Sequence, residues 1–280
     1  MSSSLAELLL LPNLESIFLY VELLGIEDQP QVDRQSLIDW IFHSTLTESQ
    51  AMKQKSPRSL SICTSSSEAS YTDTVIFSFY TSPVPSRHTP SKWRSDATVA
   101  ILLTSETDPS RAVLYESIRT VFATVPLSQL NCIQAEFEED FRLPIELIID
   151  FLDDLSSLTH LIVNGMAAYV SFFYALVRRT GPERHAGVFF MSLRTISLLN
   201  IGIGEWDQTC FTKLVDRRSA ACRSAKRRYG ADFGVEHWLL ASLMMRKSAA
   251  ETVGIEKITV EWDPVHEDLR KLVENIEVTV

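Results

Sequence analysis

The sequence predicts an α/β protein in which short parallel strands alternate with helices along one elongated stack. Two observations predict this fold: an aliphatic spacing recurs along the chain, and the segments between its copies carry apolar residues at helical intervals. The chain has 280 residues, 45% of which are hydrophobic, so it can bury a substantial core.

A fixed aliphatic spacing is the strongest pattern. The frame L-x-x-L-x-x-[LI]-x-[LVA] occurs four times, once with Phe first, and a shortened fifth copy follows. Its last positions alternate as side chains do on a strand, so each copy predicts a short strand entered through a turn. The copies that begin at 127, 155 and 190 lie 28 and 35 residues apart. The frame residues are Leu11, Leu14, Ile17, Leu19; Leu127, Leu130, Ile133, Ala135; Leu155, Leu158, Leu161, Val163; Phe190, Leu193, Ile196, Leu198; and Ile255, Ile258, Val260.

The segments between these strands have the periodicity of helices. We expect helices over 110–125, 144–155, 169–179, 208–229 and 264–275. Parallel strands need long crossovers, and a helix is the usual one. The alternation at about 30-residue intervals indicates an irregular leucine-rich-repeat solenoid of alternating short parallel strands and helices. Doubly wound α/β folds share the alternation but do not require a repeated Leu frame.

The N-terminal part is organised differently. Residues 53–73 are rich in Ser and Thr and poor in large apolar groups, so we expect a flexible Ser-rich loop there. The β-branched and aromatic runs at 74–80 and 98–103 predict two strands. The predicted organisation is an N-terminal repeat-like segment (1–52), the loop (53–73) and a leucine-rich-repeat-like domain (74–280).

One uncharged stretch, 155–177, is long enough to span a bilayer. Its several polar residues favour instead a buried strand, a turn at Asn164 and Gly165, and a packed helix. The N-terminus has no Lys or Arg before its short apolar run, unlike a secretory signal. The four cysteines are scattered, as in proteins of a reducing compartment. We therefore expect a cytoplasmic or nuclear protein.

Composition and motifs argue against several chemistries. The net charge of -10 disfavours nucleic acid as the main partner. The G-x-G at 202–204 lacks the third Gly of a dinucleotide fingerprint, and no two of the six histidines have the i, i+4 spacing of a helical metal pair. We expect His160 to have a structural, hydrogen-bonded role and the acidic run 136–140 to be a solvated loop. The sequence predicts no catalytic, cofactor-binding or metal site, and hence a protein that is not an enzyme.

A basic stretch stands out against the acidic background. It could be a nuclear-import or acidic-partner patch, a phosphate-binding edge, or a solvated helix face paired with acids such as Asp216, Asp232 and Glu236. The candidate basic patch, on one long predicted helix, consists of Lys213, Arg217, Arg218, Arg223, Lys226, Arg227 and Arg228.

The C-terminal part resembles the repeat region of fungal F-box-like leucine-rich-repeat proteins. The resemblance is carried by KLVDRRSAACRSAKRR (213–228), IEKITVEW (255–262), DLRKLVENI (268–276) and EVTV (277–280). LTHLIVNGMAAYVSFFYAL and SLRTISLLNIGI resemble the family's two central repeats. The similarity covers 70–280 and, more faintly, 1–45, and its motifs are hydrophobic spacings rather than fixed polar residues.

The resemblance implies a substrate-recognition subunit of a cullin-type ubiquitin ligase. Such proteins usually carry an N-terminal F-box that recruits the ligase adaptor, and residues 1–50 show none. We expect a non-enzymatic protein-interaction module with protein partners, including ubiquitin-ligase components, and with no cofactor, nucleic acid or membrane. The alternatives are a small α/β enzyme with a site at the strand ends, or a degenerate copy without activity.

Overall fold

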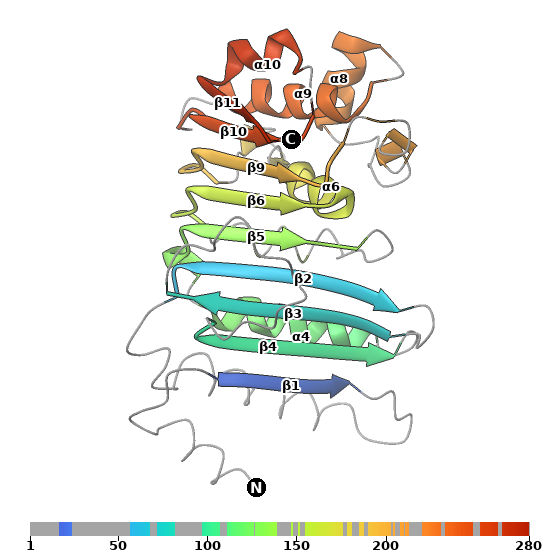
Figure 1. Ribbon diagram of the computed structural model, residues 1–280, viewed down its shortest axis with the longest axis vertical. Helices are drawn as coiled ribbons and strands as arrows, with labels where there is room; N and C mark the ends of the chain where they lie inside the picture. Colours follow the sequence, from blue (N-terminus) through green and yellow to red (C-terminus); the bar gives the residue numbers. More distant parts are fainter. Residues whose placement is uncertain are drawn as a thin grey trace, which may run out of the picture. The chain divides into compact units, whose positions relative to one another are not determined.

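The computed structural model (Figure 1) describes part of the chain in detail. The described residues are 17–23, 57–67, 72–81, 97–106, 111–125, 127–138, 147, 151, 155–175, 178–180, 185–187, 190–202, 204, 208–209, 211–212, 220–230, 233–248, 253–262 and 265–279. Contacts divide the chain into two compact units, Met1–Ile133 (unit 1) and Gln134–Val280 (unit 2). The division falls inside the stretch 74–280 that the sequence suggests is one domain. The protein is α/β, with mainly parallel strands.

Unit 1 is a mixed sheet covered by a helix. Its strands follow the order β1-β4-β3-β2, with β1 parallel to β4 and with β3 antiparallel to both β4 and β2. Alternation along β3 turns Val75, Phe77 and Phe79 into the core, and Phe77 meets Phe122 of α4 edge to face at 5.6 Å. The elements are β1 (Ile17–Leu23), β2 (Ser59–Ser67), β3 (Thr72–Tyr80), β4 (Val99–Glu106), α4 (Arg111–Thr124) and η2 (Leu127–Gln129).

The predicted Ser-rich loop is wrong over 59–67, because these residues form strand β2. Nine consecutive residues of β2 pair with β3, so their backbone groups are satisfied within the sheet. Leu60 and Ile62 supply buried apolar groups, and the small Ser59 and Ser61 side chains fit into the interior. Tertiary pairing therefore overrides the weak strand propensity of serine.

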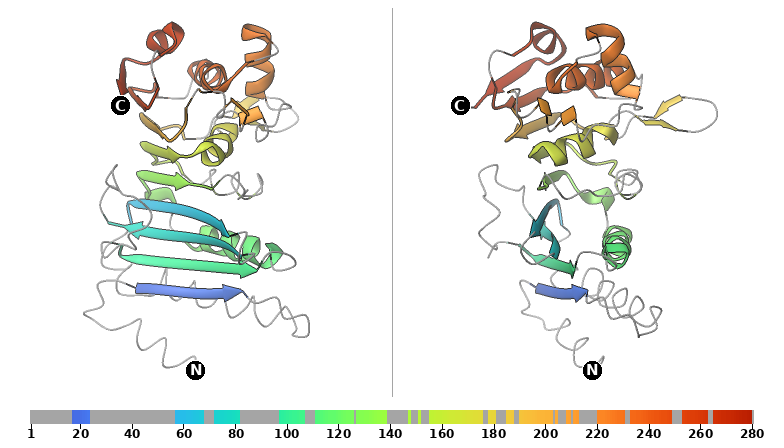
Figure 2. Two further views of the ribbon diagram at one scale, coloured as in Figure 1. Left: turned by 45° about the vertical axis from the view of Figure 1, so that its right-hand side comes forward. Right: turned by 90° about the vertical axis from the view of Figure 1, so that its right-hand side faces the viewer.

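Unit 2 is a parallel sheet with helical crossovers. Its strand order is β5-β6-β9-β10-β11, where β5 begins with the last two residues of unit 1, and the pairs β6–β9, β9–β10 and β10–β11 are parallel. Helices α6 and α9 lie on one side of β6, β9 and β10 (Figure 2). The elements are β5 (Cys132–Glu136), β6 (His160–Asn164), α6 (Met166–Ala175), β7 (Arg178–Thr180), β8 (His185–Gly187), β9 (Thr195–Leu199), α8 (Ala220–Tyr229), α9 (Val235–Lys247), β10 (Lys257–Val260), α10 (Glu267–Leu272) and β11 (Asn275–Val278).

The repeated aliphatic positions lie in register across the strands of unit 2. Leu161 is the Cα partner of Ile196, which is in turn the partner of Ile258, and all three are fully buried. Val163 pairs with Leu198 in the next buried row, where Val260 of β10 also lies. Each aliphatic side chain thus packs against its equivalent on the neighbouring strand. Of the first copy only Ile17 and Leu19 are among the described residues, in β1.

The described part of the uncharged stretch, 155–175, forms the strand, turn and helix that the sequence predicts. Gly165 takes a φ of +87° between β6 and α6, and a Cβ there would lie 3.1 Å from the carbonyl oxygen of Phe137. The buried hydroxyl of Tyr169 on α6 donates to the carbonyl oxygen of Val235 at the start of α9. Among the helices in the described part of the chain, none is both long and apolar enough to cross a bilayer.

The other predicted helices have mixed outcomes. The helix expected over 110–125 is confirmed as α4, whereas the one expected over 264–275 is shorter, because α10 covers only Glu267–Leu272 and Asn275 already begins β11. The one expected over 169–179 ends early: 178–180 is β7, which pairs with β8, and Gly181 and Pro182 follow, which disfavour a continued helix. Of 144–155 and 208–229 only parts are described. Helix α9 is absent from the prediction, because Trp238 to Leu243 are all buried and their apolar pattern has no polar face.

Candidate partner-binding surfaces

The side chains that alternate with the buried rows form a largely polar face, here called the strand face, in which Ile162 and Thr259 are themselves buried. On it His160 lies beside Thr195, and Ser197 lies between Ile162 and Thr259 in the next row. The register and the alternation of the strands place every member on the same side of the sheet. The strand face consists of His160, Ile162, Asn164, Thr195, Ser197, Leu199, Lys257, Thr259, Asn275 and Glu277.

Charges of both signs lie at the β10–β11 side of the strand face. The ammonium of Lys257 is 2.5 Å from a carboxylate oxygen of Glu277 and lowers the pKa of that carboxyl. Thr259 donates from Oγ1 to the same carboxylate at 3.4 Å. Before the strands begin, Arg194 pairs with Glu256 at 2.5 Å. Exposed pairs of this kind contribute little stability, so they remain available to exchange partners.

A polar link joins the carboxyl ends of the strands. The amide of Asn200 donates from Nδ2 to Oδ1 of Asn164 at 2.6 Å, across the gap between β6 and β9. Asn200 adopts a left-handed φ of +52°, which asparagine tolerates better than most residues, and its backbone N–H donates to the carboxylate of Glu261. This end of the sheet is therefore held by side chains that the aliphatic frame does not include.

The predicted basic patch is described only in part. Lys213, Arg217 and Arg218 lie outside the described residues, as do the proposed acidic neighbours Asp216 and Asp232. The remaining members project from α8, where they are exposed, while Cys222 and Ala225 on the same helix are buried. These exposed members are Arg223, Lys226, Arg227 and Arg228.

Asp268 meets this patch, and its carboxylate lies 3.6 Å from the guanidinium of Arg228. Glu236, the third acid proposed as a neighbour, accepts instead from the backbone N–H of His266 at 2.6 Å. Arg228 of α8 is thus paired with an acid on α10. For this residue the patch is a solvated helix face paired with a neighbouring acid, one of the alternatives that the sequence leaves open.

Three rings from α8, α9 and the start of α10 form a cluster, here called the histidine cluster (Tyr229, His237 and His266). Tyr229 stacks on His237 at 4.5 Å, and the two imidazoles lie 5.9 Å apart. Each imidazole accepts a backbone hydrogen bond through Nδ1: His237 from Gly234 at 3.2 Å, and His266 from Asp268 at 3.1 Å. Both helix starts thus depend on an unprotonated ring nitrogen.

Acid should loosen this cluster. Burial, and secondarily the nearby His266, lower the pKa of His237, while Glu236 raises it less. A folded-state pKa below the unfolded value of 6.5 means that the unfolded chain binds more protons just below that pH. We therefore expect the free energy of unfolding to be constant above pH 6.5 with respect to this group, and to fall as the pH drops below it. Urea titrations between pH 7 and pH 5 measure this slope.

His237→Gln is the matched variant for that experiment. Glutamine at the third helical position can accept the same backbone hydrogen bond and does not titrate. The variant should retain the stability of the natural chain at pH 7 and show a shallower decline toward pH 5. Identical slopes in the two proteins would contradict a role for His237.

The other candidate residues do not lie together in one site. Within the described residues, no group of three or more His, Cys, Asp or Glu side chains is placed to hold a metal ion. His160 is exposed on the strand face, and its Nδ1 lies 2.8 Å from Oγ1 of Thr159. The expectation of a solvated loop is wrong for Glu136, which is the last residue of strand β5, while Glu138 is exposed and residues 139–140 lie outside the described residues.

The fold and these surfaces define an α/β protein in which the parallel strands of unit 2 pair with their repeated aliphatic positions in register. No family model matches the chain, and neither the curated proteins nor the solved structures contain a match.

The strand face was not identified from the sequence. The repeat frame predicts which residues are buried, and its intervening positions are the signal that could have located this surface.

Proposed function

We propose that the protein is a non-enzymatic protein-interaction module whose partner binds the strand face. The observation that carries the proposal is the in-register alignment of the aliphatic frame, which leaves the alternate, mostly polar positions of successive strands side by side. Repeated strand–helix units that stack in this way form extended binding surfaces without a catalytic pocket. An irregular leucine-rich-repeat solenoid in unit 2 is the arrangement that this alignment supports best.

The face suits a polar protein partner. Thr195 and Ser197 are partly exposed and present short hydroxyl groups, which lose little conformational entropy on binding and both donate and accept hydrogen bonds. Lys257 and Glu277 can exchange their mutual pair for charges on the partner. The C-terminal part resembles F-box-like repeats, so the proposal extends to the recognition of substrates for a ubiquitin ligase. We propose that this recognition takes place in the cytoplasm or nucleus.

Ser197→Arg tests the proposal, because it places a long cation in the middle of the strand face. Proximity labelling in cells, with the natural chain and the variant as baits, should show the partner enrichment falling by about tenfold or more. Enrichment of ligase components by the natural chain would support the adaptor function, and their absence would leave a free-standing binding module.

Ser128→Arg is the control for this experiment. Ser128 is exposed on η2 in unit 1, so the same substitution there should leave the enriched proteins unchanged. Thermal unfolding of both variants checks that each remains folded. A Ser197→Arg chain that retains every partner of the natural chain would exclude the strand face as the binding surface.

A further inference from the structure

The histidine cluster attaches the start of α10 to the two helices beside it. Tyr229 of α8 stacks on His237 of α9 at 4.5 Å and meets the ring of His266 at 6.1 Å. Glu236, in the first turn of α9, accepts a hydrogen bond from the backbone N–H of His266 at 2.6 Å. Since His266 is the residue immediately before α10, these contacts determine where that helix begins.

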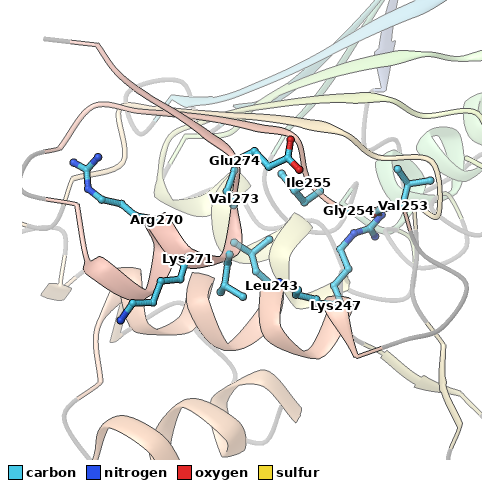
Figure 3. A pocket seen from close by; sticks show the side chains of 11 residues that line it. Leu243, Lys247, Val253, Gly254, Ile255, Arg270, Lys271, Val273 and Glu274 are labelled. Atoms are coloured by element: carbon cyan, nitrogen blue, oxygen red, sulfur yellow. The ribbon is translucent and has the colours of Figure 1, made fainter.

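The other end of α10 is packed less closely. A cavity of about 590 Å³ lies between the last turns of α9 and α10, with Leu243 and Val273 in its lining (Figure 3). Protein interiors leave few voids larger than a water molecule, so a cavity of this size gives α10 room to move. The chain then passes from Leu272, the last residue of α10, to Asn275, the first of β11. Because β11 has only β10 as a neighbour among the described strands, a shift of α10 can loosen β11 as well.

The closed arrangement requires both imidazoles to be neutral. Nδ1 of His237 accepts from the N–H of Gly234 at 3.2 Å, and Nδ1 of His266 accepts from that of Asp268 at 3.1 Å. A protonated imidazole carries a hydrogen on each nitrogen, so it cannot accept these bonds and turns an N–H toward an N–H. His237 also lies in the first turn of α9, where the positive end of the helix dipole disfavours a further positive charge. Acid therefore removes a contact from the start of each helix.

The positive charges near the rings add to this effect. Protonation of both imidazoles places two cations at ring centres 5.9 Å apart. The guanidinium of Arg228 lies 5.7 Å from the centre of the Tyr229 ring, which itself stacks on His237. Burial raises the pKa of Tyr229, so this phenol stays neutral and does not offset the cations. A doubly protonated cluster thus holds three positive charges around one neutral ring.

The carboxylates near the rings are already engaged. Asp268 lies 3.6 Å from Arg228, and Glu267 lies 2.8 Å from Lys271. Burial, and then the nearby His266, lower the pKa of His237 by more than Glu236 raises it. The closed cluster therefore resists protonation. Beyond the cluster itself, the charged groups around the rings in the described part of the chain are Arg228, Glu236, Glu267, Asp268 and Lys271.

We propose that His237 and His266 form an acid-sensitive latch, which holds α10 and the following strand β11 in place at neutral pH and releases them in weak acid. Once α10 has moved, the rings are in water and bind protons with the ordinary affinity of histidine. Since the closed state binds fewer protons, the open state gains population as the pH falls below 6.5. Opening also moves Asn275 and Glu277, which lie on the strand face. The latch depends on the helices alone, so it stands independently of the proposed partner surface.

Hydrogen exchange of the full chain measures the opening. The amides of Asn275 and Thr279 donate to the carbonyl oxygens of Glu256 and Val260, so they exchange when β11 separates from β10. After correction for the intrinsic pH dependence of exchange, their protection should fall about fivefold or more between pH 7 and pH 5. Protection in β6 and β9 should change by about twofold or less over the same range. Equal losses in all these strands, or no loss in β11, would overturn the proposal.

His237→Gln with His266→Asn is the variant that removes the titrating groups. The side-chain oxygens of glutamine and asparagine can accept the same backbone hydrogen bonds, and they do not change with pH. Strand β11 of this chain should stay protected at pH 5. His160→Gln, which removes an exposed histidine of the strand face, should lose protection in β11 as the natural chain does.

His237→Gln alone is the milder change, and it should reduce the loss of protection in β11. Circular dichroism at pH 7 checks that each chain is folded. A loss as large as that of the natural chain in the single and the double variant would show that the histidines do not control the opening.

Discussion

Leu161→Ala should lower the free energy of unfolding by about 2–5 kcal/mol, among the largest effects expected of a single substitution in this chain. Leu161 is fully buried in β6, beside Ile196 of β9. The variant loses the transfer free energy of the removed carbons and leaves a void that the neighbouring strand can fill only in part. Urea unfolding monitored by tryptophan fluorescence measures the change.

Ser197→Ala is the control for the packed row. Ser197 lies on the opposite face of the same sheet and is half exposed, so its substitution should change stability by about 0.5 kcal/mol or less. A Leu161→Ala chain as stable as the Ser197→Ala chain would mean that the repeated aliphatic positions do not form the core of unit 2.

Arg246→Met should lower the free energy of unfolding by about 2–4 kcal/mol. Methionine keeps most of the volume of the apolar stem but cannot donate hydrogen bonds. The carbonyl oxygens of Phe190 and Leu193 then lose a charged donor in a buried site, and each buried acceptor left unsatisfied costs about 1–3 kcal/mol. Thermal and urea unfolding of the variant measure the loss.

Lys247→Met separates this effect from a general loss of charge. Lys247 is the next residue on α9 and is exposed, so the same substitution there should be nearly neutral. If the two variants unfold at the same urea concentration, Arg246 does not hold the segment around Phe190 in place.

The buried rows of unit 2 could be predicted from the sequence because their physics is local and periodic. A strand buries every second residue, so recurring aliphatic positions predict β6, β9 and β10 and the side that each turns inward. Strand β2 could not be predicted in this way. Its serines have weak strand propensity, and the segment is a strand because β3 pairs with it along nine residues, a contact that its own residues do not encode.

The candidate surfaces depend on contacts between distant segments. Arg246 meets carbonyl groups more than 50 residues away, and the histidine cluster joins Tyr229, His237 and His266 from three helices. These residues are brought together by the packing of distant segments, which their spacing along the chain does not reveal. The basic stretch was visible in the sequence because its charges cluster within 213–228, but the pairing of Arg228 with Asp268 was not.

The in-register ladder also determines how unit 2 can loosen. Strand β9 has neighbours on both sides, β6 and β10, whereas β11 is the last strand in the order and has only β10 among the described strands. In a stack held by nearest-neighbour contacts, separating β11 breaks one interface, while separating β9 breaks two. We therefore expect local opening to begin at β11, so that the strand carrying Glu277 can adapt its shape while Ser197 remains on the more firmly held β9.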